Sequence, residues 1–140
     1  MKHSTMVIAA LAIFAAPAFA QEYPAKQVRV VLPFPAGGGS DLIARVVAQK
    51  LSGTLGHPVV VENRAGASGN IAAEIVAKAP ADGYTLLFGN SSLSISPAVF
   101  QKLNYDPVRD LTPISMASSY PFTLVIHPSL PVQSVKTLVA

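Results

Sequence analysis

A proline-flanked triple glycine is the feature of this 140-residue sequence that could bind an anion. The backbone can adopt positive φ angles at Gly37, Gly38 and Gly39, because these residues have no Cβ atom, and a ligand can approach their N–H groups closely. Ser40 or Asp41 is expected to cap the helix that follows. The first N–H groups of a helix lack internal partners and carry the positive end of its dipole, which predicts a carboxylate or phosphate site. A plain strand-to-helix turn without a ligand is the alternative for such a cluster.

A dinucleotide-binding loop is the main alternative from another functional class. Gly37 and Gly39 fit the pattern G-x-G-x-x-G, and Glu62 ends the second expected strand where the ribose-binding acid would stand. Leu42, however, occupies the place of the third glycine. A dinucleotide-binding oxidoreductase with a degenerate glycine loop therefore stays open as an alternative at this point.

Other catalytic and metal-binding motifs are incomplete. No lysine completes a nucleotide phosphate-binding loop, and no serine stands in a G-x-S-x-G sequence. His57 and His127 have no second ligand at metal-binding spacing. We therefore expect no catalytic residue, no metal and no cofactor.

The elements that would position the glycine loop alternate between strand and helix patterns. Apolar residues from Val28 to Leu32 predict a buried strand that Pro33 and Pro35 end. A helical period follows and predicts a packed face, and Gly53 and Gly56 offer its stop. The residues of that expected face are Leu42, Ile43, Val46, Val47 and Leu51. The run of valines at 59–61 then predicts a strand buried on both faces.

The alternation continues along the chain. Ser68 or Asn70 is expected to cap a second helix, and residues 84–88 predict a third strand. A hydroxyl-rich loop at residues 89–96 should lead into a short helix from Pro97 to Leu103. Two further strands are expected at 114–117 and 123–127, before a helix that Ser134 opens.

This order predicts an α/β fold with a parallel sheet and right-handed crossovers. Ligands of such sheets bind beyond the carboxyl ends of the strands. The loops at Gly37 and Asn90 both follow strands, so we expect them to border one crevice.

The first twenty residues predict export. They combine the basic Lys2, an apolar stretch from Met6 to Ala16 and a small-x-small ending at Ala20, which is typical of a cleaved signal peptide. Without that segment nine basic side chains face seven acidic ones, so net charge is only +2 and nucleic acid is not an expected partner. The absence of cysteine means that a core, not disulfides, must stabilise the exported chain.

Several separated motifs together resemble one family. PFPAGGGSDLIAR, VVVENRAGASGNIAAEIVAKAPADGYTLLFGN, SPAVFQKLNYDPVRDLTPIS and LVIHPSLPVQSVKTL are similar to the tripartite tricarboxylate transporter receptors, or Bug family of periplasmic solute-binding proteins. The resemblance implies a type II periplasmic binding fold, non-enzymatic and monomeric. Its two lobes would close on a small carboxylate and deliver it to a membrane permease. Residues 21–119 would form the first lobe and residues 120–140 the crossover and the start of a truncated second lobe.

The resemblance also implies which residues bind the carboxylate. Backbone N–H groups and water would hold it at the first loop, with Asp41 capping the helix. The implied contacts are Phe34, Ala36, Gly37, Gly38, Gly39, Ser40 and Asp41 in the first loop, Ser68 and Gly69 at the mouth of the cleft, and Asn90, Ser91 and Ser92 in the third loop.

Overall fold

Three parallel strands form the sheet, as the strand and helix patterns predicted. The computed structural model describes residues 22–121 and 123–139, so the expected signal peptide and its cleavage lie outside the described residues. The strands are β1 (Val28–Leu32), β2 (Val59–Asn63) and β3 (Thr85–Leu87), in the order β2-β1-β3. The central position of β1 explains its near-complete burial.

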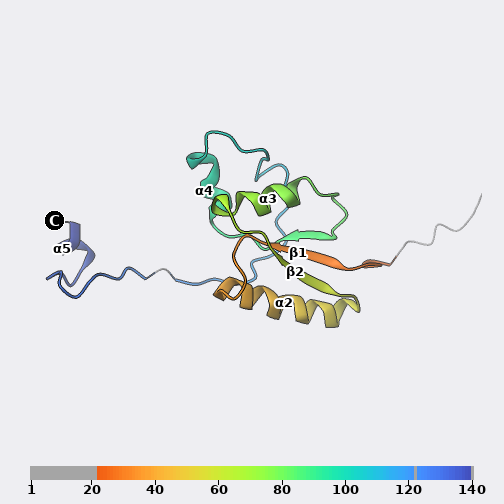
Figure 1. The fold of residues 1–140 in the computed structure, drawn as a ribbon, viewed down its shortest axis with the longest axis horizontal. Helices are drawn as coiled ribbons and strands as arrows, with labels where there is room; N and C mark the ends of the chain where they lie inside the picture. The colour runs from red at the N-terminus through yellow and green to blue at the C-terminus, as the bar shows by residue number, and fades with distance from the viewer. Residues whose placement is uncertain (1–21, 122, 140) are drawn as a thin grey trace, which may run out of the picture.

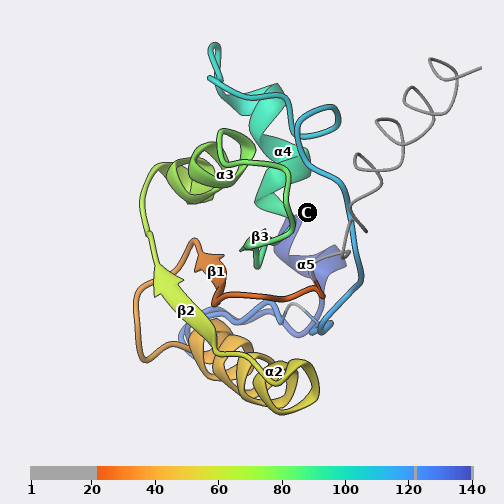
Figure 2. The ribbon, with the colours of Figure 1, turned by 90° about the vertical axis from the view of Figure 1, so that its right-hand side faces the viewer.

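Helices cover both faces of this sheet (Figure 1). The long helix α2 (Gly39–Leu55) lies on one face, and α3 (Asn70–Ala77) and α4 (Ser92–Val99) lie on the other (Figure 2). A short 3-10 turn, η2 (Ala67–Gly69), leads into α3 and contacts α4. The chain therefore alternates strand and helix in three layers.

The packed face of α2 differs from the expected one. Asp41, Ala44 and Ala48 are the buried residues of the helix, whereas Leu42 is 67% exposed. Among the other residues of the expected face, Val46 and Leu51 are exposed and Ile43 and Val47 are half-buried. The reason is steric: alanines bring the helix axis close to the sheet, and Ala48 packs with Val28 of β1.

The second strand is not buried on both faces, contrary to the prediction. It lies at an edge of the sheet, and Val60 is 41% exposed. On its other side, Val59 packs in the core beneath α2. On the face of the sheet opposite α2, helix α3 contacts β1 and β3. The same face of β2 is therefore left uncovered.

Three later predictions also need correction. Helix α4 begins at Ser92 and contains Pro97, so the expected helix from Pro97 to Leu103 is wrong. Its hydrogen bond from Phe100 N to Ser96 O, 2.9 Å long, shows that the helix tolerates one missing N–H group. The stretches 114–117 and 123–127 form no strand, because no neighbouring strand offers them a ladder among the described residues.

The final helix, α5 (Val135–Val139), follows Ser134 as expected. The Ser134 hydroxyl accepts a hydrogen bond from the N–H of Thr137, at 3.2 Å. Helix α5 lies away from the sheet (Figure 1). None of the helices in the described ranges is long and apolar enough to cross a membrane.

Candidate functional site

The site lies where the chain changes sides of the sheet. The helix after β1 packs on one face, and the helix after β3 packs with α3 on the opposite face. Because β1 and β3 are neighbours, the loops that follow them diverge and leave a crevice beyond their carboxyl ends. A cavity of about 230 Å³ occupies this position. It is lined by Phe34, Ser40, Ile43, Phe88, Gly89, Asn90, Ser91, Ser118, Ser119 and Tyr120.

The predicted convergence of the first and third loops is therefore present in the geometry. Phe34 and Ser40 come from the first loop and the start of α2, and Asn90 and Ser91 come from the third. The remaining first-loop residues, Ala36, Gly37, Gly38, Gly39 and Asp41, do not line this cavity.

Sequence reasoning missed several lining residues. The segment 118–120 lies at the boundary between the expected first lobe, 21–119, and the expected crossover, and no motif marks it. Ile43 was assigned to the packed helix face, but it follows Ser40 by one turn and so points to the same end of α2. Phe88 was the last residue of an expected strand, and that position could have indicated its role.

Side-chain hydrogen bonds hold the first loop in place. Asn63, at the end of β2, donates from Nδ2 to the Phe34 carbonyl at 3.0 Å and to Oδ1 of Asp41 at 2.9 Å. The other carboxylate oxygen of Asp41 accepts the Gly37 N–H at 3.0 Å. Arg45 donates to both Asp41 and Asn63, at 2.9 and 3.1 Å. The loop is thus tied to β2 and to the first two turns of α2.

Asp41 serves the loop and does not cap the helix in the predicted way. Helix α2 begins at Gly39 with Gly38 as its N-cap, so neither Ser40 nor Asp41 holds the cap position. The carboxylate is only 5% exposed. Hydrogen bonds from Arg45, then from Gly37 and Asn63, hold the pKa of Asp41 well below its usual range, although desolvation opposes the shift. Its charge is already neutralised by Arg45.

The N-terminus of α2 opens toward the cavity. The Leu42 N–H donates to the Gly38 carbonyl at 3.0 Å, so the N–H groups of Gly39 and Ser40 precede the first hydrogen bond of the helix. Ser40 lines the cavity at this end. Only Gly37 of the three glycines has a positive φ, at 85°, whereas Gly38 has an ordinary extended conformation.

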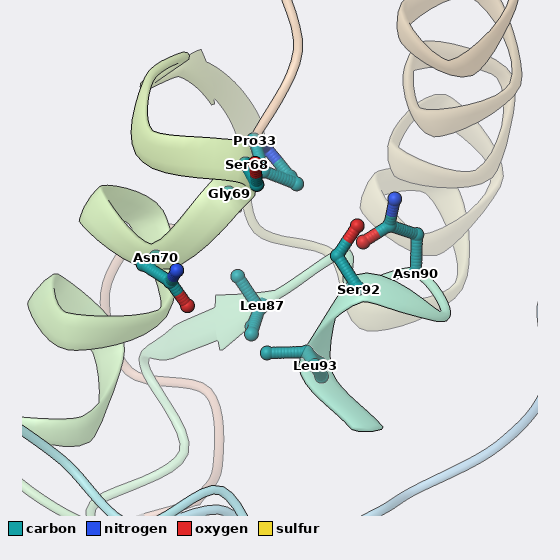
Figure 3. Close-up of a pocket in the computed structure, with 9 residues that line it drawn as sticks. Pro33, Ser68, Gly69, Asn70, Leu87, Asn90, Ser92 and Leu93 are labelled. Carbon is teal, nitrogen blue, oxygen red and sulfur yellow. The ribbon is translucent and has the colours of Figure 1, made fainter. Parts of the chain in front are cut away.

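A second, narrower cleft shares Gly89 and Asn90 with the first, and Figure 3 shows the residues that line it. It is lined by Pro33, Ser68, Gly69, Asn70, Leu87, Gly89, Asn90, Ser92 and Leu93. Leu87 and Leu93 project between Asn70 on α3 and the loop at Asn90 (Figure 3). The cleft is too narrow to admit a water molecule. The implied contacts that line a cleft are therefore divided between two clefts that share Gly89 and Asn90, and the other first-loop residues line neither.

Asn70 is a buried residue that lines the narrow cleft, and it does not cap a helix. It is only 8% exposed, and its Oδ1 accepts the hydroxyl proton of Tyr105 at 2.7 Å. Its Nδ2 has no hydrogen-bond partner among the residues that the structure describes. The N-cap of α3 is Gly69, with φ of 93°, so neither Ser68 nor Asn70 caps this helix. The preceding turn places Ser68 itself at a positive φ of 55°.

Among the residues that the structure describes, no charged side chain lines either cleft. An anion there would be held by N–H groups, hydroxyls and an amide, which suits recognition by preorganised dipoles. Within residues 22–121 and 123–139, no group of three His, Cys, Asp or Glu residues could hold a metal ion.

The comparisons with known proteins agree with this geometry. Residues 43–140 match the model of the tripartite tricarboxylate transporter family receptor. The chain belongs to this family. It is 42% identical to BugT of Bordetella pertussis, and the match covers 97% of this chain and 44% of that protein. The chain thus spans less than half the length of this curated relative.

Solved structures show the same fold. The periplasmic binding protein BugD is 41% identical, with a TM-score of 0.60 over 63% of this chain and 29% of its own. MatC from Rhodopseudomonas palustris with bound malate is 41% identical, with a TM-score of 0.57 over 65% of this chain and 31% of its own. An R. palustris protein with adipate is 40% identical, with a TM-score of 0.65 over 84% of this chain and 40% of its own. The expected α/β fold of periplasmic binding proteins is therefore confirmed.

Proposed function

We propose that this protein is a non-enzymatic receptor that captures a small carboxylate at the cavity between the loops after β1 and β3. The observation that carries the proposal is the N-terminus of α2, which opens into a cavity at the topological switch point whose described lining residues carry no charge. The family membership supports it, as do two related structures that contain malate and adipate.

Within this proposal, the start of α2 supplies an N–H group at Ser40, and the third loop supplies polar groups at Asn90 and Ser91. Asp41 positions the first loop and does not contact the anion, since two carboxylates would repel each other. Ser68, Gly69 and Ser92 would join the site only if the narrow cleft opened.

The dinucleotide-binding alternative loses its main support in the structure. Glu62, the acid that would bind a ribose, forms ion pairs with Arg29 at 3.1 Å and with Arg64. The family membership points the same way. A bound nicotinamide would absorb and fluoresce, so its optical signal in the purified protein would contradict the receptor function.

The proposed partners and location follow from the family. The receptor would work in the periplasm after cleavage between Ala20 and Gln21, and it would deliver its solute to the permease subunits of a tripartite transporter. Intact mass spectrometry of the exported protein should give a chain that begins at Gln21. Retention of residues 1–20 on a membrane-bound product would contradict this.

A two-lobed architecture is part of the proposal. Residues 21–119 would form one lobe and residues 120–140 the crossover and the start of another. Closure of two lobes excludes water and supplies contacts from both sides. A single lobe should therefore give far less than half of the usable affinity once the entropy of association is subtracted.

Thermal unfolding with a panel of mono-, di- and tricarboxylates tests the function. In the complete protein, a solute at about 100 times its Kd should stabilise the fold by roughly 2.7 kcal/mol, because it binds only the native state. Residues 21–140 alone should show no comparable shift. If no carboxylate raises the Tm of the complete protein, the receptor function is wrong. An equal rise in both would instead contradict the two-lobe mechanism.

A further inference from the structure

The segment 118–120, which follows the three-stranded sheet in the chain, contributes an aromatic residue to the cavity. Ser118, Ser119 and Tyr120 line the cavity together with residues from the start of α2 and from the loop after β3. Tyr120 is 58% exposed, so much of its ring still has apolar surface to bury. A ligand that enters the cavity would bury part of this surface.

Apolar side chains from three different parts of the chain meet around this cavity. Phe34 follows β1, Phe88 follows β3, and Ile43 projects from the second turn of α2. Together with Tyr120 they form what we call the apolar wall. Phe34, Ile43 and Phe88 are half-buried, so part of each side chain can still contact a ligand.

The distribution of charged side chains near the cavity also bears on which ligands it can hold. Its lining within the described part of the chain includes no lysine, arginine or histidine, and the nearby cation Arg45 is already paired with Asp41. One carboxylate group can be held by the dipoles at the α2 N-terminus. The carbon chain of the ligand then meets the apolar wall.

We infer that the apolar wall selects carboxylates with an unsubstituted carbon chain or ring over hydroxylated acids of the same length, and that Tyr120 is a specificity-determining residue. This inference rests on the proposed function. Moving a methylene chain out of water and against the apolar wall is favourable, because it buries apolar surface. A hydroxyl that faces the apolar wall loses hydrogen bonds to water, and the side chains of Phe34, Ile43 and Phe88 cannot replace them, unlike the serines and Asn90 that line the rest of the cavity.

Two matched pairs of acids test the selectivity. Adipate and galactarate share a six-carbon chain, which carries four hydroxyls in galactarate, and succinate and tartrate are the corresponding four-carbon pair. Calorimetric titration of the complete protein should show adipate binding at least about tenfold more tightly than galactarate, with a smaller difference for the shorter pair. Equal or tighter binding of the hydroxylated acids would overturn the inference and leave the receptor function standing. If no acid of the carboxylate panel bound, the proposed function would fail as well.

Variants of Tyr120 test its role separately. Tyr120→Ala should lower the affinity for adipate about tenfold and narrow the difference from galactarate, whereas Tyr120→Phe should retain both, because the ring makes the contact. Val108→Ala, at an exposed position outside the cavity, serves as the control. Thermal unfolding of each variant checks that the fold is intact. Unchanged selectivity in a folded Tyr120→Ala protein would overturn the assignment of Tyr120.

Discussion

The amide of Asn63 lies 2.9 Å from the carboxylate of Asp41 and so connects the end of β2 to the first turn of α2. The same amide nitrogen donates to the Phe34 carbonyl at 3.0 Å. Asn63 pairs with Leu32 across the parallel ladder, which places it beside the loop that leaves β1. One neutral side chain thus sets where the proposed anion-binding loop stands relative to the helix N-terminus.

Replacing Asn63 with alanine should therefore impair carboxylate binding, although Asn63 does not itself line the cavity. The loop would lose both ties to β2, and we expect the affinity of the complete protein for its carboxylate to fall about tenfold, together with a lower Tm. Asn104→Ala is the matched control, since Asn104 makes one exposed hydrogen bond to Glu74, at 3.3 Å. Titration calorimetry compares the two. Equal affinities would show that the loop keeps its position without Asn63.

Asp41 predicts a specific loss of stability in acid. Its hydrogen bonds from Arg45, Gly37 and Asn63 depress the pKa in the folded state. The stabilisation is therefore fully present above the ordinary carboxyl range near about 4, and it is lost as pH falls toward the folded-state value. Denaturant unfolding at a series of pH values should show a flatter acid limb for Asp41→Asn than for the wild type. Parallel acid limbs would mean that Asp41 contributes nothing to this dependence.

Two adjacent glycines should respond differently to a side chain. A Cβ atom at Gly38 would lie 3.8 Å from the Pro35 carbonyl oxygen, and the extended backbone there suits valine. Gly38→Val should therefore keep its Tm but bind carboxylate more weakly, because the side chain would obstruct the approach to the loop. Gly37→Ala should instead lose about 1 kcal/mol of stability, since its φ is 85°. Thermal melts and calorimetry of both variants make the comparison, and unchanged affinity in Gly38→Val would limit the glycines to a turn function.

The buried hydrogen bond of Tyr105 should contribute measurably to stability. Tyr105→Phe would remove the partner of Asn70 Oδ1, whose amide nitrogen already lacks one among the described residues. We expect the free energy of unfolding to fall by about 1–3 kcal/mol. Tyr23→Phe is the control, because the exposed Tyr23 hydroxyl donates to the Gly83 carbonyl, which water can reach. Denaturant titration of both variants measures the difference, and equal losses would contradict the burial argument.

Burial also predicts a change at high pH. It raises the pKa of Tyr105, with a further contribution from the charge of Glu74. A raised folded-state pKa means that the folded state holds its proton longer, so stability should fall as pH rises above about 10. Tyr105→Phe should reduce this fall in denaturant titrations. An unchanged fall would assign it to other groups.

Some elements could be predicted from the sequence because local chemistry decides them. The valine run of β1 and the prolines after it require a buried strand that ends there, and the structure has it at Val28–Leu32. The C-terminus of α2 could also be predicted, since Gly56 adopts the left-handed conformation that ends the helix. The alternation of such segments was sufficient to predict the parallel sheet and the edge at which the loops meet.

Other features depended on contacts between residues far apart in the chain. The spacing of apolar residues in α2 was compatible with more than one buried face of the helix. The buried face was decided by the packing of Ala44 and Ala48 against the sheet. The edge position of β2 follows from strand order, which its own sequence does not encode. The stretches at 114–117 and 123–127 have strand-like composition, but a strand also needs a partner for its N–H and C=O groups.

The sequence by itself determined the glycine loop, the helix after it and the family resemblance, because these reside in contiguous motifs. Only the tertiary structure decided that Asn63 secures the loop, that Tyr120 borders the cavity, and that some of the implied contacts line two separate clefts while others line neither. The physical reason is that a site is formed by side chains from separate elements. Their distances depend on strand order, helix packing and the path of the crossing segment, and no local pattern specifies these.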